Sequence, residues 1–160
     1  MSRTITWLHL SGLHAGRPQR GWDMRRVTDT LVADLRAMQN QFGLCPDFIF
    51  YTGDSVFGNL GNGPLGAIKE QFEAAHNFLE KVRCVFSPEV PRSRLYIVPG
   101  NHDVNRLMVT PDQTQWLNTV REVEIIINMI QDGGLQWQRI IERLSDYRIF
   151  LETNVNGVSP

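Results

Sequence analysis

The sequence predicts an α/β fold with the element order β-α-β-α-β, followed by a helical hairpin. Three observations predict it: three short apolar runs of strand length, two amphipathic segments of helical period between them, and glycine or proline at the boundaries. Strands joined in this way by helices are expected to run parallel. We therefore divide the chain into an α/β core over residues 1–110 and a helical hairpin over residues 111–160.

The first half of the core reads as strand, helix and strand. Residues 4–10 alternate in polarity and run into a polar loop that ends at His14. A helix is predicted from an N-cap at Asp23 to a stop at Gly43. Residues 47–52 form the second strand, which ends abruptly at Gly53-Asp54 before a glycine-rich loop. The apolar stripe that predicts the helix consists of Val27, Leu31, Leu35, Met38 and Phe42.

The second half of the core adds a helix and a third strand. Residues 95–98 form a short apolar run that is broken by Pro99-Gly100, as expected where a strand ends. The helix before it is predicted from the stripe Ile68, Phe72, Ala75, Leu79 and Val82.

Beyond the core the apolar period is helical. A first stripe runs from Trp116 to Ile130, residues 132–134 interrupt it with two glycines, and a second stripe runs from Trp137 to Leu151. This pattern predicts a helical hairpin that packs on the core or leads into a further domain.

Composition limits the class of protein. The chain has 160 residues, 42% of them hydrophobic and 21% charged, which is typical of one globular domain and excludes a disordered chain. No apolar run exceeds four residues, so no membrane span is predicted and we expect a cytoplasmic protein. The net charge of −1 gives no general case for nucleic-acid binding. Cys45 and Cys84 are expected to be reduced thiols.

Polar side chains follow each of the three predicted strands. His14 follows the first, Asp54 the second, and the run Asn101-His102-Asp103 the third. The carboxyl ends of parallel strands share one edge of a sheet, where ligands bind. Imidazole, carboxylate and amide donors suit manganese, iron or zinc. The sequence therefore predicts a metal site at this edge.

These residues resemble the motifs of the calcineurin-like metallophosphoesterases, which read D-x-H, G-D and G-N-H-[DE] at the ends of successive strands. Here the motifs are Gly12-Leu13-His14, Gly53-Asp54 and Gly100-Asn101-His102-Asp103. The resemblance covers about residues 4 to 106 and implies that the core is half of that family's α/β sandwich. It also implies two divalent metals, with manganese expected and iron, zinc or magnesium as alternatives. Such a pair clamps a phosphate and activates a bridging hydroxide.

The resemblance assigns a role to each motif residue. His14 would ligate the first metal, Asp54 would bridge both metals, and Asn101 would ligate the second. His102 would stabilise or protonate the leaving-group oxygen, and Asp103 would orient the His102 imidazole.

Two departures from the family pattern bear on activity. Gly12 stands where the family has a ligating aspartate, so one ligand of the first metal is lost. No histidine follows His102, so the late G-H-x-H ligands of the family are missing as well. The chain could be the N-terminal portion of a longer protein, as in bacterial multidomain relatives, or a relative that has lost its metals, and Gly12 could also be an introduced substitution. His9 and His76 are expected to be packed or surface residues.

We expect a phosphoesterase that hydrolyses phosphodiesters, with nucleic acid as one candidate substrate and with impaired activity in this form. Arg17 and Arg20 follow the first motif and are candidate phosphate ligands. An alternative is a catalytically inactive domain used for assembly or ligand sensing in a larger protein. A third reading is an interaction module in which the hairpin forms a homo-oligomer through Trp116 or Trp137.

Overall fold

A parallel three-stranded sheet forms the centre of the computed structural model, which describes residues 4–17, 24–58 and 67–155. The strands are β1 (Trp7–Leu10), β2 (Phe48–Thr52) and β3 (Leu95–Val98). They lie in the order β1-β2-β3, and both neighbouring pairs are parallel, as the sequence predicts. All three strands therefore end at one edge of the sheet.

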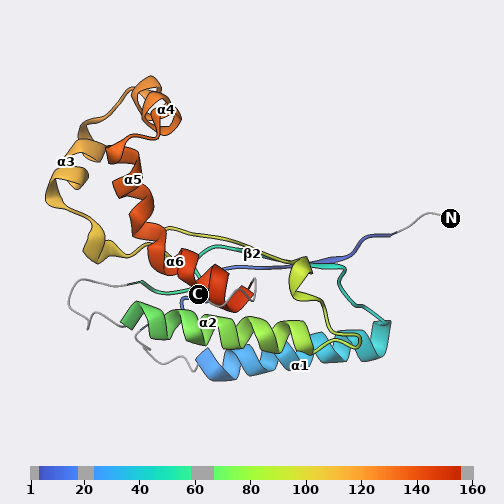
Figure 1. Ribbon diagram of the computed structural model, residues 1–160. Helices are drawn as coiled ribbons and strands as arrows, with labels where there is room; N and C mark the ends of the chain where they lie inside the picture. The colour runs from blue at the N-terminus through green and yellow to red at the C-terminus, as the bar shows by residue number, and fades with distance from the viewer. Residues whose placement is uncertain (1–3, 18–23, 59–66, 156–160) are drawn as a thin grey trace.

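Two long helices cover one face of this sheet, α1 (Met24–Phe42) and α2 (Ala67–Cys84) (Figure 1). Ile49 and Tyr51 of β2 point to this face and are fully buried, while their neighbours Phe48 and Phe50 point the other way. The core is completed by the predicted stripe of α2, whose buried members are Ile68, Phe72, Ala75, Leu79 and Val82. The α/β expectation is thus confirmed for the core.

Local hydrogen bonds mark the start of the first strand and the end of the first helix. The first strand begins at Trp7 and not at Thr4. Just before it, the Thr6 amide donates to the Asp47 carboxylate at 2.9 Å and the Asp47 amide donates to the Thr6 carbonyl at 2.7 Å, so Asp47 pairs with Thr6 partly through its side chain. Helix α1 ends where Gly43 adopts φ +66° and its amide donates to the Gln39 carbonyl at 2.8 Å, a left-handed C-terminal cap. The predicted N-cap at Asp23 lies outside the described residues.

The opposite face of the sheet is apolar and exposed within the described residues. Trp7 is 62% exposed and Tyr96 is 49% exposed, although both lie on strands. The rings of Phe50 and Tyr96 stack at a centroid distance of 5.4 Å. Parallel sheets in proteins are usually covered on both faces, so this face has the composition of an interior without a covering layer in the described chain.

The C-terminal part has more helices than the predicted hairpin. Its elements are α3 (Pro111–Thr119), α4 (Val123–Asp132), α5 (Leu135–Ile141), α6 (Ser145–Phe150) and the π-helical turn η4 (Leu151–Val155). A capping box between Thr110 and Gln113 starts α3, and extended backbone at Val120 and Glu122 separates it from α4. The apolar period continues across this break, which is why the sequence reads as one helix.

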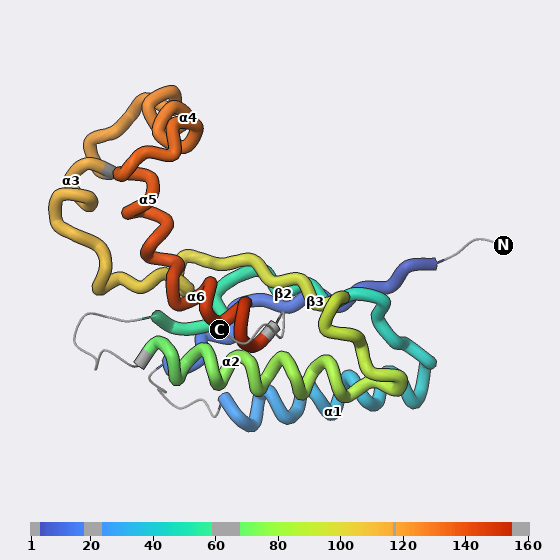
Figure 2. Tube along the Cα trace, viewed as in Figure 1, coloured from blue at the N-terminus to red at the C-terminus, as the bar shows by residue number. Residues whose placement is uncertain are grey.

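Of these helices, α6 packs on the core. Phe150 is buried and stacks on Phe72 of α2 at a centroid distance of 5.0 Å. Helices α3, α4 and α5 instead project away from the sheet (Figures 1 and 2).

None of the described helices is long and apolar enough to cross a membrane. Both cysteines are free thiols, as expected.

Candidate metal centre

The loops that follow β1 and β2 remain joined by main-chain hydrogen bonds beyond the sheet. The Gly12 amide donates to the Gly53 carbonyl at 3.1 Å, and the His14 amide donates to the Asp54 carbonyl at 2.9 Å. Tyr51 connects the same loops, since its hydroxyl accepts from the Leu13 amide at 2.8 Å. Burial raises the pKa of Tyr51 to about 12, so this hydroxyl keeps its proton. The first two motifs are therefore held in fixed register.

Two residues of these loops have left-handed backbone. His14 has φ +48° and Asp54 has φ +58°, and they are the only non-glycine residues with positive φ in the described chain. This conformation is unfavourable for side chains other than those of Gly, Asn and Asp, and persists where the surrounding structure imposes it. Such strain concentrates at functional sites, and here it occurs at His14, one of the three predicted metal ligands. Asp54, a second predicted ligand, shares this backbone conformation but is of a residue type that adopts it more readily.

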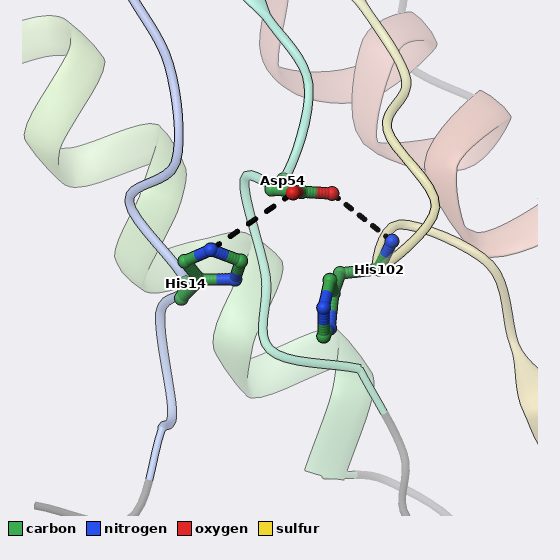
Figure 3. A group of neighbouring side chains, drawn as sticks. All are labelled: His14, Asp54 and His102. Carbon is green, nitrogen blue, oxygen red and sulfur yellow. Dashed lines mark hydrogen bonds and ion pairs between the residues drawn. The ribbon is translucent and has the colours of Figure 1, made fainter.

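His14, Asp54 and His102 come together at the carboxyl edge of the sheet (Figure 3). Each offers one ligand atom, and the three atoms lie within 4.8 Å of one another. Asp54 lies between the histidines: one carboxylate oxygen is 3.9 Å from His14 Nε2, and the other accepts a hydrogen bond from the His102 amide at 3.1 Å. This group could hold a metal ion. It includes His102, which the family resemblance assigns to the leaving group.

The donor set fits a metal ion. The group offers two imidazoles and one carboxylate, a combination suited to first-row divalent metals. His14 Nδ1 is buried and has no hydrogen-bond partner among the described residues. The other ring nitrogen, Nε2, is the one that lies 3.9 Å from the Asp54 carboxylate, so Nε2 is the atom placed to ligate a metal beside Asp54. The His14 and Asp54 side chains are also only about a quarter exposed, at 23% and 26%.

The His102 ring is held by main chain and not by Asp103. Its Nδ1 lies 2.8 Å from the Phe57 carbonyl oxygen, and its ring stacks on that of Phe57 at a centroid distance of 5.6 Å. The expectation that Asp103 orients the imidazole is therefore wrong. The physical reason is that the Asp103 carboxylate is occupied elsewhere, by the amides of Gly100 at 2.7 Å and Val56 at 3.1 Å.

Asp103 instead connects the loops of the second and third motifs by accepting hydrogen bonds from main-chain amides in both. It is fully buried, and this burial raises the pKa of its carboxyl, while the hydrogen bonds from main-chain amides oppose the increase. It accepts from the amide of Val56 in one loop and from that of Gly100 in the other. Asp103 therefore has a structural role, because it holds the two loops of the site together.

Glycines allow the loops to approach each other. A Cβ at Gly53 would lie 2.8 Å from the Gly100 Cα, and a Cβ at Gly100 would overlap the Asp54 carboxylate. Glycine is thus required at both motif positions. Gly53 leaves room for the main chain of Gly100, and Gly100 leaves room for the Asp54 carboxylate.

Gly12 lies beside the metal ligands, at the position of the missing aspartate. It has φ +70°, and a Cβ built there would lie 3.9 Å from His14 Nε2, with no other described atom within 4 Å apart from its chain neighbours. The space that an aspartate side chain would need is therefore open and directed towards His14.

The remaining predicted site residues are placed differently. Asn101 is exposed on the loop next to His102. Arg17 lies near the site, with its guanidinium carbon 5.9 Å from the centre of the Phe57 ring. Arg20 lies outside the described residues. Phe57 was not predicted, because its contribution is a main-chain carbonyl that no residue pattern reveals.

Comparison with known proteins adds no family assignment, because neither a scan against family models nor a search of curated proteins found a match.

Proposed function

We propose that this chain is a metal-dependent phosphoesterase domain that hydrolyses phosphodiesters, with activity impaired in this form. The observation that carries the proposal is the convergence of His14, Asp54 and His102, from the ends of three strands, on one group of ligand atoms within 4.8 Å. The three residues are widely separated in sequence, and their order matches the three motifs of calcineurin-like metallophosphoesterases. The impairment follows from Gly12, which offers no side-chain ligand, and from the absence of histidine after His102.

The residues have distinct roles in this proposal. His14, Asp54 and Asn101 would hold two divalent metals, with manganese as the expected ion. Bound metal ions supply Lewis acidity to a phosphoryl oxygen. His102 presents Nε2 to the substrate, because Nδ1 is bonded to the Phe57 carbonyl. In the protonated ring, Nε2–H is a donor for the leaving-group oxygen.

Arg17 favours a nucleotide-like or nucleic-acid substrate within this class. Its guanidinium lies against the Phe57 ring, which in turn stacks on His102. A guanidinium held beside the catalytic histidine can pair with a second phosphate of an extended substrate. Arg17 is therefore the first residue to replace when DNA and RNA strands are compared as substrates.

The proposal is tested by hydrolysis of bis(p-nitrophenyl) phosphate with manganese, in the parent chain and in Gly12→Asp. We expect weak activity in the parent and an increase of at least about tenfold in Gly12→Asp, because the new carboxylate adds a metal ligand beside His14. In the Gly12→Asp background, Asp54→Asn should abolish activity and metal binding together. His102→Gln separates the two roles open to His102: a lower kcat with metal binding intact supports the leaving-group role, and a joint loss of both supports a ligand role. Inactivity of both the parent and Gly12→Asp would reject the proposal.

A second candidate, a catalytically inactive domain used for assembly, is favoured by one observation. Helix α4 is rich in apolar residues, yet none of its described residues is buried. Val123 is 68% exposed, and four isoleucines of the helix are also exposed. A helix that is apolar on most sides is normally covered by other protein. If a second copy of the chain covers it, sedimentation velocity should show a dimer that Ile127→Asp dissociates, while Gly12→Asp gains no metal affinity.

A further inference from the structure

The loop that carries the Phe57 carbonyl is itself held by a side chain of α2. The side-chain oxygen of Gln71 accepts from the Phe57 amide at 3.0 Å and from the Gly58 amide at 3.0 Å. The Gln71 side-chain nitrogen also donates to the Gly58 carbonyl at 3.4 Å. Gln71 therefore hydrogen-bonds to the main chain of two successive residues, Phe57 and Gly58. Phe57 is also the residue whose carbonyl lies next to His102 Nδ1.

Gln71 also contacts the loop after β1. Gly16 has φ +81°, and a Cβ there would overlap the Gln71 side chain, so the two lie in close contact. The Phe57 amide donates to the Ala15 carbonyl at 2.9 Å in the same region. The main-chain bond between Phe57 and Ala15 thus joins the two loops, and Gln71 packs against the β1 loop beside it.

The contact between the β2 loop and His102 leaves little room for movement. Gly58 has φ +83°, and a Cβ there would lie 2.7 Å from the His102 carbonyl oxygen. The Phe57 ring stacks on the imidazole with an interplanar angle of 25°, and its carbonyl is 2.8 Å from Nδ1. Since a carbonyl only accepts hydrogen bonds, Nδ1 carries the proton, and in the neutral ring the lone pair is on Nε2.

We propose that Gln71 is a positioning residue for His102: it fixes the Phe57-Gly58 main chain, and the Phe57 carbonyl then fixes the orientation and the tautomer of the imidazole. This proposal rests on the proposed function for its catalytic consequence. Its structural content, the state of the His102 ring, does not depend on activity. The hydrogen bonds of Gln71 described here reach the main chain of Phe57 and Gly58, so it acts on His102 through that loop.

Three variants test how the Gln71 side-chain oxygen, which accepts from both amides, contributes to the position of the loop. Gln71→Met keeps the side-chain length but accepts no hydrogen bond from the loop, and Gln71→Asn is too short to reach both amides. Gln71→Glu keeps an acceptor oxygen for both amides and loses only the longer bond to the Gly58 carbonyl, so it should retain more of the parent behaviour than Gln71→Met. Glu73→Met is the matched control, because Glu73 is exposed on the same helix.

The first readout is the nitrogen-15 spectrum of the His102 side chain, recorded on the full chain without metal. The parent, Gln71→Glu and Glu73→Met should show the Nδ1–H tautomer, whereas Gln71→Met and Gln71→Asn should show a mixture of tautomers. Unfolding of one of these two variants leaves the other to decide. An unchanged Nδ1–H tautomer in a folded Gln71→Met or Gln71→Asn would overturn the proposal.

The second readout is phosphodiester hydrolysis in the Gly12→Asp background. We expect Gln71→Met to lower kcat by about tenfold, as replacement of an outer hydrogen-bond partner typically does, with KM and manganese affinity within about twofold. An altered tautomer in chains that are all inactive would support the positioning role and reject the proposed function. If the chains are active and the His102 tautomer is the same with and without Gln71, the proposed function would be supported and the positioning role rejected.

Discussion

At the scale of single residues, the site depends on how closely main chain can approach Asp54. Gly100 packs against Gly53 and against the Asp54 carboxylate, so any side chain at Gly100 displaces the bridging ligand of the proposed metal site. Interiors tolerate such overlap poorly, because packed main chain cannot move aside as a flexible side chain does.

We therefore predict that Gly100→Ala lowers the free energy of unfolding by roughly 2 kcal/mol or more and weakens manganese binding at least about tenfold. The control is Gly134→Ala, because Gly134 has φ −64° and a Cβ there meets no described atom within 4 Å. Urea unfolding of both variants measures the first effect. Equal stability of Gly100→Ala and Gly134→Ala would contradict the packing described here.

Only part of this residue-scale picture could be predicted from the sequence. His14, Asp54 and His102 were identified because each follows a strand and matches a short motif. The partner of His102 was assigned wrongly to Asp103, since adjacency in sequence does not show that a buried carboxylate is already occupied by two amides. Gln71 lies beside the apolar stripe of α2, and nothing in the sequence distinguishes it from a surface glutamine.

At the scale of elements, α2 is joined to the segment before β3 by a cluster of charges. The Glu80 carboxylate accepts hydrogen bonds from Arg83 at 2.8 and 3.1 Å, and from Arg92 at 3.0 and 3.2 Å. Arg92 begins the 3-10 turn η1 (Arg92–Arg94), which leads directly into β3. The cluster therefore fixes the entry of the third strand relative to the helix behind it.

The cluster predicts a pH dependence of stability. Hydrogen bonds from Arg83, and then from Arg92, lower the pKa of Glu80 to about 2, from its ordinary value of 4.5. Because the folded state has the lower pKa, this contribution to stability is complete above about pH 4.5 and is lost as the pH falls towards 2. Glu80→Gln should cost about 1–2 kcal/mol near neutral pH, and the difference from the parent should shrink below pH 4.5.

Glu152→Gln is the control for this measurement. Glu152 is exposed and its carboxylate is 3.9 Å from Arg148 within one helical turn, so its replacement should change stability by less than about 0.5 kcal/mol. Chemical unfolding at several pH values compares the two variants. A Glu80→Gln effect that is constant from pH 7 to pH 2.5 would contradict the assignment.

The periodicity of the sequence predicted the elements of the core but not those beyond it. The stripe of α2 is buried and the stops at Gly43 and Pro99-Gly100 agree with the structure. Of the predicted α1 stripe only Leu35 is buried and Leu31 partly so, whereas Val27, Met38 and Phe42 are exposed, because α1 touches the core along a narrower face than its apolar period suggests. Beyond residue 110 the apolar residues keep a helical period through a break at Val120, where the backbone is extended. Periodicity reports which residues are apolar at a given spacing, and it does not report whether the helix axis continues between them.

Across the whole molecule, the metal group and the exposed apolar surfaces are formed by different residues. The group lies at the carboxyl edge of the sheet, one face of which is covered by α1 and α2 (Figure 1). The exposed face around Trp7 and Tyr96 and the projecting helix α4 are apolar surfaces of the described chain. Their burial pattern could not be predicted from sequence, since continuous apolar strands read as covered on both faces.

In our proposal, the three strand ends form a metal site that Gly12 leaves incomplete. It is tested most directly by bound manganese per chain after dialysis, measured by elemental analysis for the parent, Gly12→Asp and Gly43→Asp. Gly43 is the matched control, because it has φ +66° and open space around it but lies at the far end of α1. It measures the cost of an aspartate in left-handed backbone without a nearby ligand group.

Gly12→Asp should bind two manganese ions, and the parent and Gly43→Asp should bind fewer and match each other. Asp54→Asn in the Gly12→Asp chain should remove the bound metal. The absence of bound manganese from both the parent and Gly12→Asp, in chains shown to be folded, would contradict the account.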